Sequence, residues 1–383
     1  MKYYIVAGEA SGDLHGSNLM KGLYAEDPGA DVRFWGGPMM LEVFNEHQEG
    51  DGLVKDYREG AVMGFVEVLL QGRKLLKRIE ACKKDIQAWK PDVVILIDYP
   101  GFNLRIAEFA HQAGYKVFYY IAPKVWASRE GRIKKLKAWV DKLFIVFPFE
   151  EEYFARHEVP YVYAGNPLVD AIENNPALKE SREAFLGRTG LPDQPWIALL
   201  AGSRNMEIKS MMPIFMAFAD EWHRTHPEDL FVLAGAPSHT SKDYDTGGRE
   251  YVKLVFGETY GALRHARAAV VNSGTASLEA ALIGTPQVVG YKMALIPAWL
   301  VRRLVKVKYA SLGNLILDRL AFREFVMGEL TPKALLEEVT RLTEDAACRQ
   351  AMLEDYAEIR SRLGGSGASG KVARAMIEEL KSP

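Results

Sequence analysis

Residues 269–291, AVVNSGTASLEAALIGTPQVVGY, predict a strand, a polar loop, a helix and a second strand in close succession. The apolar run ends at Val271, and small polar residues follow it. A segment with helical periodicity then ends near Gly284, and Pro286 precedes the second β-rich run. This order is half of a nucleotide-binding α/β unit.

The loop between the first strand and the helix predicts a phosphate site. Ser273, Gly274 and Thr275 place backbone N–H groups and two hydroxyls at a helix N-terminus, where the helix dipole favours an anion. Glu279 lies four residues past Thr275, so its carboxylate could reach the ribose of a nucleotide bound there. An ordinary capped helix remains the alternative, because Ser and Thr are also common N-caps.

Length and composition narrow the class of protein. A chain of 383 residues is too long for one typical core, so two α/β domains are expected. A net charge of −2 gives no overall attraction to nucleic acid. Cys82 and Cys348 are the only cysteines and lack metal-ligand spacing, which favours a reducing cytosol and predicts no structural zinc. With no signal-peptide pattern and no long apolar run, we expect a protein that is neither exported nor integral to a membrane.

A second ligand-binding loop is predicted near the N-terminus. The strand Tyr3–Ala7 runs into GEASGDLHG, residues 8–16, whose glycine spacing matches neither a dinucleotide fingerprint nor a Walker loop. A Gly-rich turn after a first parallel strand is where an open α/β sheet builds its sites, so we interpret it as a sugar or phosphate cradle. Asp13 and His15 are candidate acid/base residues, although Asp13 also fits a helix start.

Asp98 is the best candidate for a catalytic base. The near-continuous apolar run Asp92–Ile97 is typical of a parallel strand buried on both faces, and DYPGFN, residues 98–103, follows it. Asp98 is therefore expected at the same edge of the sheet as residues 8–16. The alternative is an Asp that only begins the turn before Pro100 and Gly101.

A new strand and helix alternation begins at Trp196. Its first turn holds Gly202 and Ser203, which allow close backbone approach, and Arg204, whose planar guanidinium suits phosphate oxygens. This helix N-terminus and the one near Ser273 could converge on one diphosphate. Asp243 and Asp245 could hold a divalent ion, but their polar surroundings favour a solvated loop.

Two segments combine apolar and basic residues as helices on an anionic membrane do. They cover residues 62–79 and 292–309. For residues 62–79 the alternative is a helix that faces the core and exposes its basic residues to solvent. The residues expected to contact the membrane are Phe65, Val66, Leu69, Trp299, Arg302 and Arg303.

Five motifs in order along nearly the whole chain resemble the lipid-A-disaccharide synthase family. They are residues 8–16, residues 98–103, GSR at 202–204, SGTASLE at 273–279 and SLGN at 311–314. The family consists of inverting glycosyltransferases of the GT-B type. The resemblance implies an α/β fold with two Rossmann-like, doubly wound domains facing across a cleft. It implies transfer from UDP-2,3-diacylglucosamine to 2,3-diacylglucosamine 1-phosphate, giving a β(1→6) disaccharide and UDP.

The resemblance also implies roles for single residues. Asp98 would be the general base. Acceptor binding would involve Ser11, Gly12, Asp13, His15 and Asn103, and UDP binding would involve Gly202, Ser203, Arg204, Ser273, Gly274, Thr275, Glu279 and Asn314. No cofactor and no metal would be needed, since the UDP-sugar is a substrate.

The resemblance further implies three regions. Residues 1–168 would bind the acceptor and carry a membrane-facing helix near 62–79, residues 169–350 would bind the UDP-sugar, and the helices of 351–383 would pack back on the first domain. The expected location is the cytoplasmic face of the bacterial inner membrane. A homo-oligomer is possible, and the sequence does not give the oligomeric state. The chain departs from the family pattern at Ala201, Gly313 and Met327. Met327 stands where the family often has a Gln, whose side-chain amide could contact the donor.

Two other functions fit part of the pattern. One is another GT-B enzyme that uses a UDP-sugar, such as a UDP-N-acetylglucosamine transferase or epimerase, because residues 202–204 and Glu279 concern only the nucleotide. The other is a membrane-surface sensor of UDP-sugars without catalysis.

Overall fold

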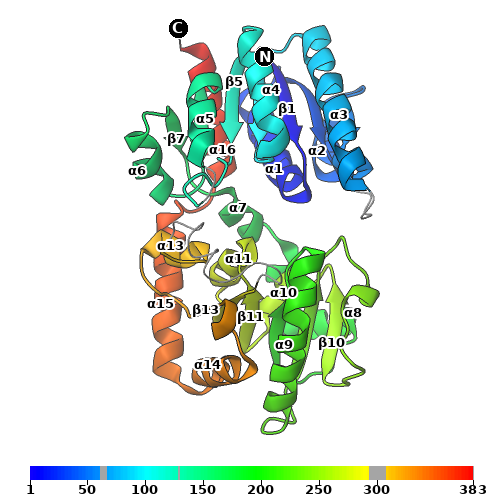
Figure 1. Ribbon diagram of the computed structural model, residues 1–383, viewed down its shortest axis with the longest axis vertical. Helices are drawn as coiled ribbons and strands as arrows, with labels where there is room; N and C mark the ends of the chain where they lie inside the picture. Colours follow the sequence, from blue (N-terminus) through cyan, green and yellow to red (C-terminus); the bar gives the residue numbers. More distant parts are fainter. Residues whose placement is uncertain (61–66, 128–129, 293–307, 383) are drawn as a thin grey trace. The chain divides into compact units, whose positions relative to one another are not determined.

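The chain forms two units, each built on one parallel β-sheet with helices packed on it (Figure 1). The computed structural model describes residues 1–60, 67–127, 130–292 and 308–382, without the side chains of residues 60 and 67–73. Unit 1 comprises Met1–Asp170 and Leu363–Pro383, and unit 2 comprises Ala171–Arg362. The chain therefore changes unit at 170/171 and 362/363, whereas the sequence led us to expect boundaries at 168 and 350.

The sheet of unit 1 has the order β3-β2-β1-β4-β5-β6-β7. Its strands are β1 Lys2–Ala7, β2 Asp31–Gly36, β3 Leu53–Asp56, β4 Val93–Ile97, β5 Lys116–Tyr120, β6 Lys142–Ile145 and β7 Tyr161–Tyr163. Every residue of β4 is buried, which confirms the prediction of a strand covered on both faces. The order reverses between the neighbours β1 and β4, so this pair is the switch point of the sheet.

The helices of unit 1 follow the strands in alternation. They are α1 Ala10–Glu26, α2 Pro38–His47, α3 Glu67–Trp89, α4 Pro100–Gln112, α5 Ile133–Trp139, α6 Phe149–Arg156 and α16 Ala368–Lys381, with 3-10 turns at η1 Tyr57–Gly60 and η2 Glu130–Arg132. The helix α7 Pro167–Glu173 spans the boundary between the units.

The C-terminal helix α16 belongs to unit 1, and Figure 1 shows it in red among the blue and cyan elements of the N-terminal half. It packs closely on α1, because a Cβ added to Gly22 would lie 2.9 Å from the Cβ of Ala373. Asp170 fixes the start of α16 by accepting hydrogen bonds from the amides of Gly367 and Ser369. The preceding helix, α15, stays in unit 2.

The described side chains of helix α3 differ in their surroundings. Ile79 is buried in the core of unit 1, whereas Leu76, three residues earlier, is 55% exposed. Cys82 and Ile86 continue the buried face one and two turns further along α3. The described part of α3 is thus a core-facing helix that leaves Leu76 on the surface.

Unit 2 repeats the architecture with the strand order β10-β9-β8-β11-β12-β13. The strands are β8 Trp196–Leu200, β9 Leu230–Gly235, β10 Val252–Phe256, β11 Ala268–Asn272, β12 Gln287–Tyr291 and β13 Glu324–Val326. Its order reverses between β8 and β11, which pair directly. These two strands precede the two loops predicted to bind the diphosphate.

The described helices of unit 2 cover its sheet and extend to the crossing back into unit 1. They are α8 Arg182–Thr189, α9 Asn205–His223, α10 Thr259–Arg264, α11 Thr275–Ile283, α13 Leu312–Leu317, α14 Pro332–Glu344 and α15 Ala346–Arg362, with 3-10 turns η3 Pro176–Leu178, η4 Ser241–Asp243 and η5 Met327–Glu329. The predicted strand, helix and strand of residues 269–291 are confirmed as β11, α11 and β12.

Candidate active site

In unit 1 the loop after β1 and the loop after β4 lie together at the switch point of the sheet. The ring of Tyr99 packs over Gly8, where an added Cβ would lie 2.3 Å from the ring. Gly8 is therefore required by the close approach of the two loops. The same ring stacks on Phe102, with the centroids 5.7 Å apart. The structure thus brings Asp98 next to the Gly-rich loop, as the sequence predicted.

Asp98 lies in a strained turn. Asp98 and Tyr99 have φ of 42° and 46°, a left-handed conformation that is unfavourable for a non-glycine residue and marked for a bulky Tyr. The carbonyl of Asp98 accepts hydrogen bonds from Tyr119 Oη at 2.6 Å and from Asn103 Nδ2 at 2.8 Å. Such strain persists because these contacts fix the turn, and it is common at active sites.

The surroundings of Asp98 raise the pKa of its carboxyl above the usual range. Burial contributes most, and the negative charge of Glu9 at the start of α1 adds to it. Lys124 and Arg132 oppose the shift with their positive charges, as does a hydrogen bond from the Tyr99 amide. A carboxyl with a raised pKa suits a general base better than an ordinary surface Asp.

Asp13 has a structural role in this edge of the sheet. It is buried, and its carboxylate accepts hydrogen bonds from the amides of Gly37, Met39 and Met40 at 2.8 to 3.1 Å. These amides open α2, so Asp13 caps that helix from α1. Three of the hydrogen bonds that its carboxylate can accept are thus used within the protein, and a contact between Asp13 and the acceptor stays a prediction.

The other predicted acceptor residues differ in accessibility. Ser11 is exposed at the start of α1, and Gly12 is buried against Ala7. Burial lowers the pKa of His15 to about 4, so its imidazole is neutral at neutral pH. Asn103 is fully buried, and its Nδ2 donates to the carbonyls of Ile97 and Asp98. Asn103 therefore holds the Asp98 turn through Nδ2, and its contact with the acceptor stays a prediction.

A loop after β5 adds residues that sequence analysis missed. Trp126 donates a hydrogen bond from its indole to the buried carboxylate of Glu150 at 3.0 Å. Glu150 also accepts from the amides of Val146 and Phe147, while burial raises its pKa to about 7. This contact ties the loop carrying Lys124, which acts on Asp98, to the end of β6.

In unit 2 the loop after β8 is organised by Glu207, which sequence analysis also missed. Its carboxylate accepts from the amides of Ser203 at 3.0 Å and Arg204 at 3.2 Å, and from the Arg204 guanidinium at 2.9 Å. Gly202 has φ of 102°, and a Cβ there would lie 2.5 Å from the Glu207 carboxylate. Glu207 stands at the N3 position of a capping box, but Arg204 is not the Ser or Thr that this motif has at the N-cap, so the sequence held only half of the signal.

This arrangement corrects one detail of the predicted phosphate cradle. The amides of Ser203 and Arg204 are not open to a phosphate, because Glu207 occupies them. The Arg204 side chain remains 78% exposed, so its guanidinium is the accessible group of this loop.

The loop after β11 keeps part of its predicted role. The Ser273 amide donates to Gly290 and its hydroxyl to Ala310, so neither is free for a phosphate. Helix α11 begins at Thr275, which is exposed, after Gly274 as N-cap. The first amides of a helix have no acceptor within the helix, which leaves an anion-binding N-terminus at Thr275.

Glu279 lies one turn into α11, close to this N-terminus. Its carboxylate accepts a hydrogen bond from Tyr260 Oη at 2.8 Å, and burial raises its pKa. Tyr260 belongs to α10 and is 19 residues away in sequence, so periodicity gave no signal for this contact.

Asn314 does not fit the predicted role in UDP binding. It is fully buried, with Nδ2 donating to Glu324 and to the Phe322 carbonyl, and Oδ1 accepting from the amide of Ala321. Glu324 in turn accepts from the amide of Ser311 at 2.8 Å. Because Asn314 is fully buried and both Nδ2 and Oδ1 are bonded to protein groups, it has a structural role here, which corrects the expectation of direct contact with UDP.

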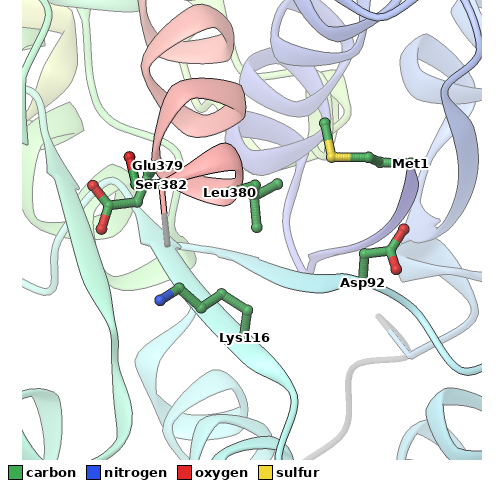
Figure 2. Close-up of a pocket in the computed structure, with 6 residues that line it drawn as sticks. All are labelled: Met1, Asp92, Lys116, Glu379, Leu380 and Ser382. Carbon is green, nitrogen blue, oxygen red and sulfur yellow. The ribbon is translucent and has the colours of Figure 1, made fainter.

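An open hollow of about 390 Å³ lies elsewhere in unit 1. Figure 2 shows the residues that line it: Met1, Asp92, Lys116, Glu379, Leu380 and Ser382. These residues include the amino ends of β1, β4 and β5, at the sheet edge opposite Asp98. Lys116 pairs with Asp141, and Glu379 pairs with Lys142, so the hollow lies away from the candidate site and is held by its own ion pairs.

Neither a metal-ligand cluster nor a membrane span occurs among the residues that the structure describes. No three His, Cys, Asp or Glu side chains of this part gather as metal ligands would. Asp243 and Asp245 instead accept from nearby amides of their own loop. No described helix has both the length and the hydropathy needed to cross a bilayer.

The residues predicted to contact a membrane fall outside what the structure describes. Phe65, Val66, Trp299, Arg302 and Arg303 lie outside the described residues, and the side chain of Leu69 is not described.

Comparison with known proteins identifies the family. The lipid-A-disaccharide synthetase family model matches residues 3–373. A lipid-A-disaccharide synthase from Myxococcus xanthus is 37% identical over 381 residues, which cover 98% of this chain and 97% of the relative.

Solved structures agree on the fold. The UDP-GlcNAc 2-epimerase from Neisseria meningitidis, solved with UDP-GlcNAc, has a TM-score of 0.72 at 14% identity, covering 99% of this chain and 100% of that chain. A glycosyltransferase of kitacinnamycin has a TM-score of 0.63 at 16% identity, covering 99% of each chain. The structural similarity shows two Rossmann-like domains. At these low sequence identities it shows nothing about the reaction. With a full-length family match and a relative at 37% identity, the chain belongs to the lipid-A-disaccharide synthetase family.

Proposed function

We propose that this hexosyltransferase joins UDP-2,3-diacylglucosamine to 2,3-diacylglucosamine 1-phosphate. The observation that carries the mechanism is the Asp98 carboxyl, held in a strained turn at the switch point of the first sheet. Asp98 takes the proton of the acceptor 6-hydroxyl while that oxygen attacks the anomeric carbon of the donor. The bond from that carbon to the diphosphate breaks, UDP leaves with the electron pair, and the configuration inverts.

The donor half of the site is proposed in unit 2. The Arg204 guanidinium and the first-turn amides of α11 stabilise the charge that develops on the departing UDP. Glu279 accepts a hydrogen bond from the ribose. Because these groups supply the positive charge, we propose that no metal and no cofactor is required, and that EDTA leaves turnover unchanged.

A UDP-GlcNAc 2-epimerase is the second candidate, since such an enzyme shares the fold. An epimerase acts on the UDP-sugar alone, whereas a transferase needs an acceptor. The family match favours the transferase.

The test measures UDP release from UDP-2,3-diacylglucosamine by purified protein in mild detergent, with and without the acceptor. We expect release only with acceptor, together with the disaccharide phosphate. UDP binding without release or disaccharide would refute the proposal and favour the sensor. Conversion of UDP-GlcNAc without an acceptor would favour the epimerase.

We also propose that the protein binds the anionic inner face of the bacterial inner membrane, where acylated substrates are found. Leu76 is 55% exposed beside the exposed Lys77 on α3, which supports contact with headgroups. Replacement of Lys77 or of Arg302 and Arg303 by Glu should reduce sedimentation with vesicles containing anionic lipid, and Lys381→Glu on α16 serves as a control. Unchanged sedimentation of the first two variants would refute this proposal.

A further inference from the structure

The contact between Tyr260 and Glu279 joins two helices of unit 2 next to the proposed donor site. Tyr260 Oη donates to Glu279 Oε1 at 2.8 Å. Among the residues that the structure describes, Tyr260 is the hydrogen-bond partner of this carboxylate. One carboxylate oxygen is thereby fixed, and the other remains able to accept from a ligand.

The short helix that carries Tyr260 is held rigidly. The carbonyl of Ala262 accepts from the Trp196 indole at 2.9 Å, and the carbonyl of Leu263 accepts from the Thr285 hydroxyl at 2.8 Å. Gly261 lies under the ring of Phe185, where an added Cβ would be 2.3 Å from the ring. Tyr260 therefore presents its hydroxyl from a fixed platform, as a positioning residue requires.

Helix α10 also lies at the ligand-binding edge of the sheet. It follows the carboxyl end of β10, just as α11 follows the carboxyl end of β11. Ligands of open parallel sheets bind at this edge. The hydroxyl of Tyr260 thus meets Glu279 on the side where the nucleotide is expected.

We propose that Tyr260 is a positioning residue that orients the Glu279 carboxylate toward the ribose hydroxyls of the uridine nucleotide. This inference rests on the proposed role of Glu279. Without the Tyr260 hydroxyl the carboxylate can rotate, so the ribose loses part of a charge-assisted hydrogen bond while the diphosphate contacts stay.

The experiment compares UDP with 2′,3′-dideoxy-UDP by calorimetry, because the second nucleotide lacks both ribose hydroxyls. We expect the wild-type protein to prefer UDP by about 10- to 100-fold, the range for a hydrogen bond to a charged group. Glu279→Gln should remove most of this preference, and Tyr260→Phe should reduce it by about 3- to 10-fold. The double variant should lose no more than Glu279→Gln alone.

Tyr251→Phe is the matched control. Tyr251 also donates its hydroxyl to a carboxylate, that of Asp220, but it precedes β10 and so lies at the opposite edge of the same sheet. We expect it to keep the wild-type preference.

Three outcomes would overturn the inference. An unchanged preference in Tyr260→Phe, with the preference lost in Glu279→Gln, would refute only the role of Tyr260. An unchanged preference in Glu279→Gln would refute the ribose contact itself, and the inference with it. Equal weakening of both nucleotides by Tyr260→Phe would show a general structural effect instead of positioning.

Discussion

Replacement of Asp98 by Asn removes the proposed base and little else. The backbone of Asp98 contacts Tyr119, Tyr120 and Asn103, and the side-chain oxygen of Asn can still accept from the Tyr99 amide as the carboxylate does. Its φ of 42° is tolerated by Asn nearly as well as by Asp. Ala at the same position would add strain of about 1–2 kcal/mol, so Asn isolates the chemistry more cleanly.

The expected loss follows from the role of a positioned base. General-base catalysis contributes roughly 10²- to 10⁴-fold. This corresponds to about 2.7–5.4 kcal/mol of activation free energy. The melting temperature of Asp98→Asn should equal or exceed that of the wild type, because a buried carboxylate with a raised pKa is removed.

The assay is steady-state UDP release with saturating donor and acceptor, together with calorimetric measurement of UDP binding. We expect kcat to fall by the factor above, while the Kd for UDP stays within about twofold, because Asp98 and the proposed UDP site lie in different units. A kcat within about tenfold of the wild type would refute the assignment of Asp98 as base. A large loss of UDP affinity would instead mean that Asp98 takes part in donor binding.

Three further predictions concern charge and stability. Glu9→Gln should move the acid limb of the pH profile of kcat/KM to lower pH, because the negative charge of Glu9 raises the pKa of Asp98; a shift to higher pH or no shift would contradict the pairing of these groups. Asp13→Ala should lower the free energy of unfolding by about 2–3 kcal/mol, measured in urea, because three amides at the start of α2 lose their acceptor. Asn314→Ala should cost about 2–4 kcal/mol yet leave the Kd for UDP within about twofold, and selective loss of UDP affinity at unchanged stability would restore a binding role.

The strands, the helices and the loops of the candidate site follow from local patterns along the chain. Continuous apolar runs such as Val93–Ile97 are typical of parallel strands covered on both faces, and their short length favours a strand over a helix. The place of a residue after such a run fixes its place at the carboxyl edge. The loops that carry Asp98, Arg204 and Thr275 therefore follow from the order of residues along the chain.

Which of these polar groups remain available to a ligand depends on contacts between elements that are distant in sequence. A hydrogen-bond donor or acceptor can be used by any partner that folding brings near, and those partners are distant in sequence. Asp13 caps a helix that begins 25 residues later, and Asn314 donates a hydrogen bond to the side chain of Glu324. Tyr260 of α10 donates a hydrogen bond to Glu279 of α11. Local periodicity carries no information about such pairings, because they arise from packing between elements and not within one.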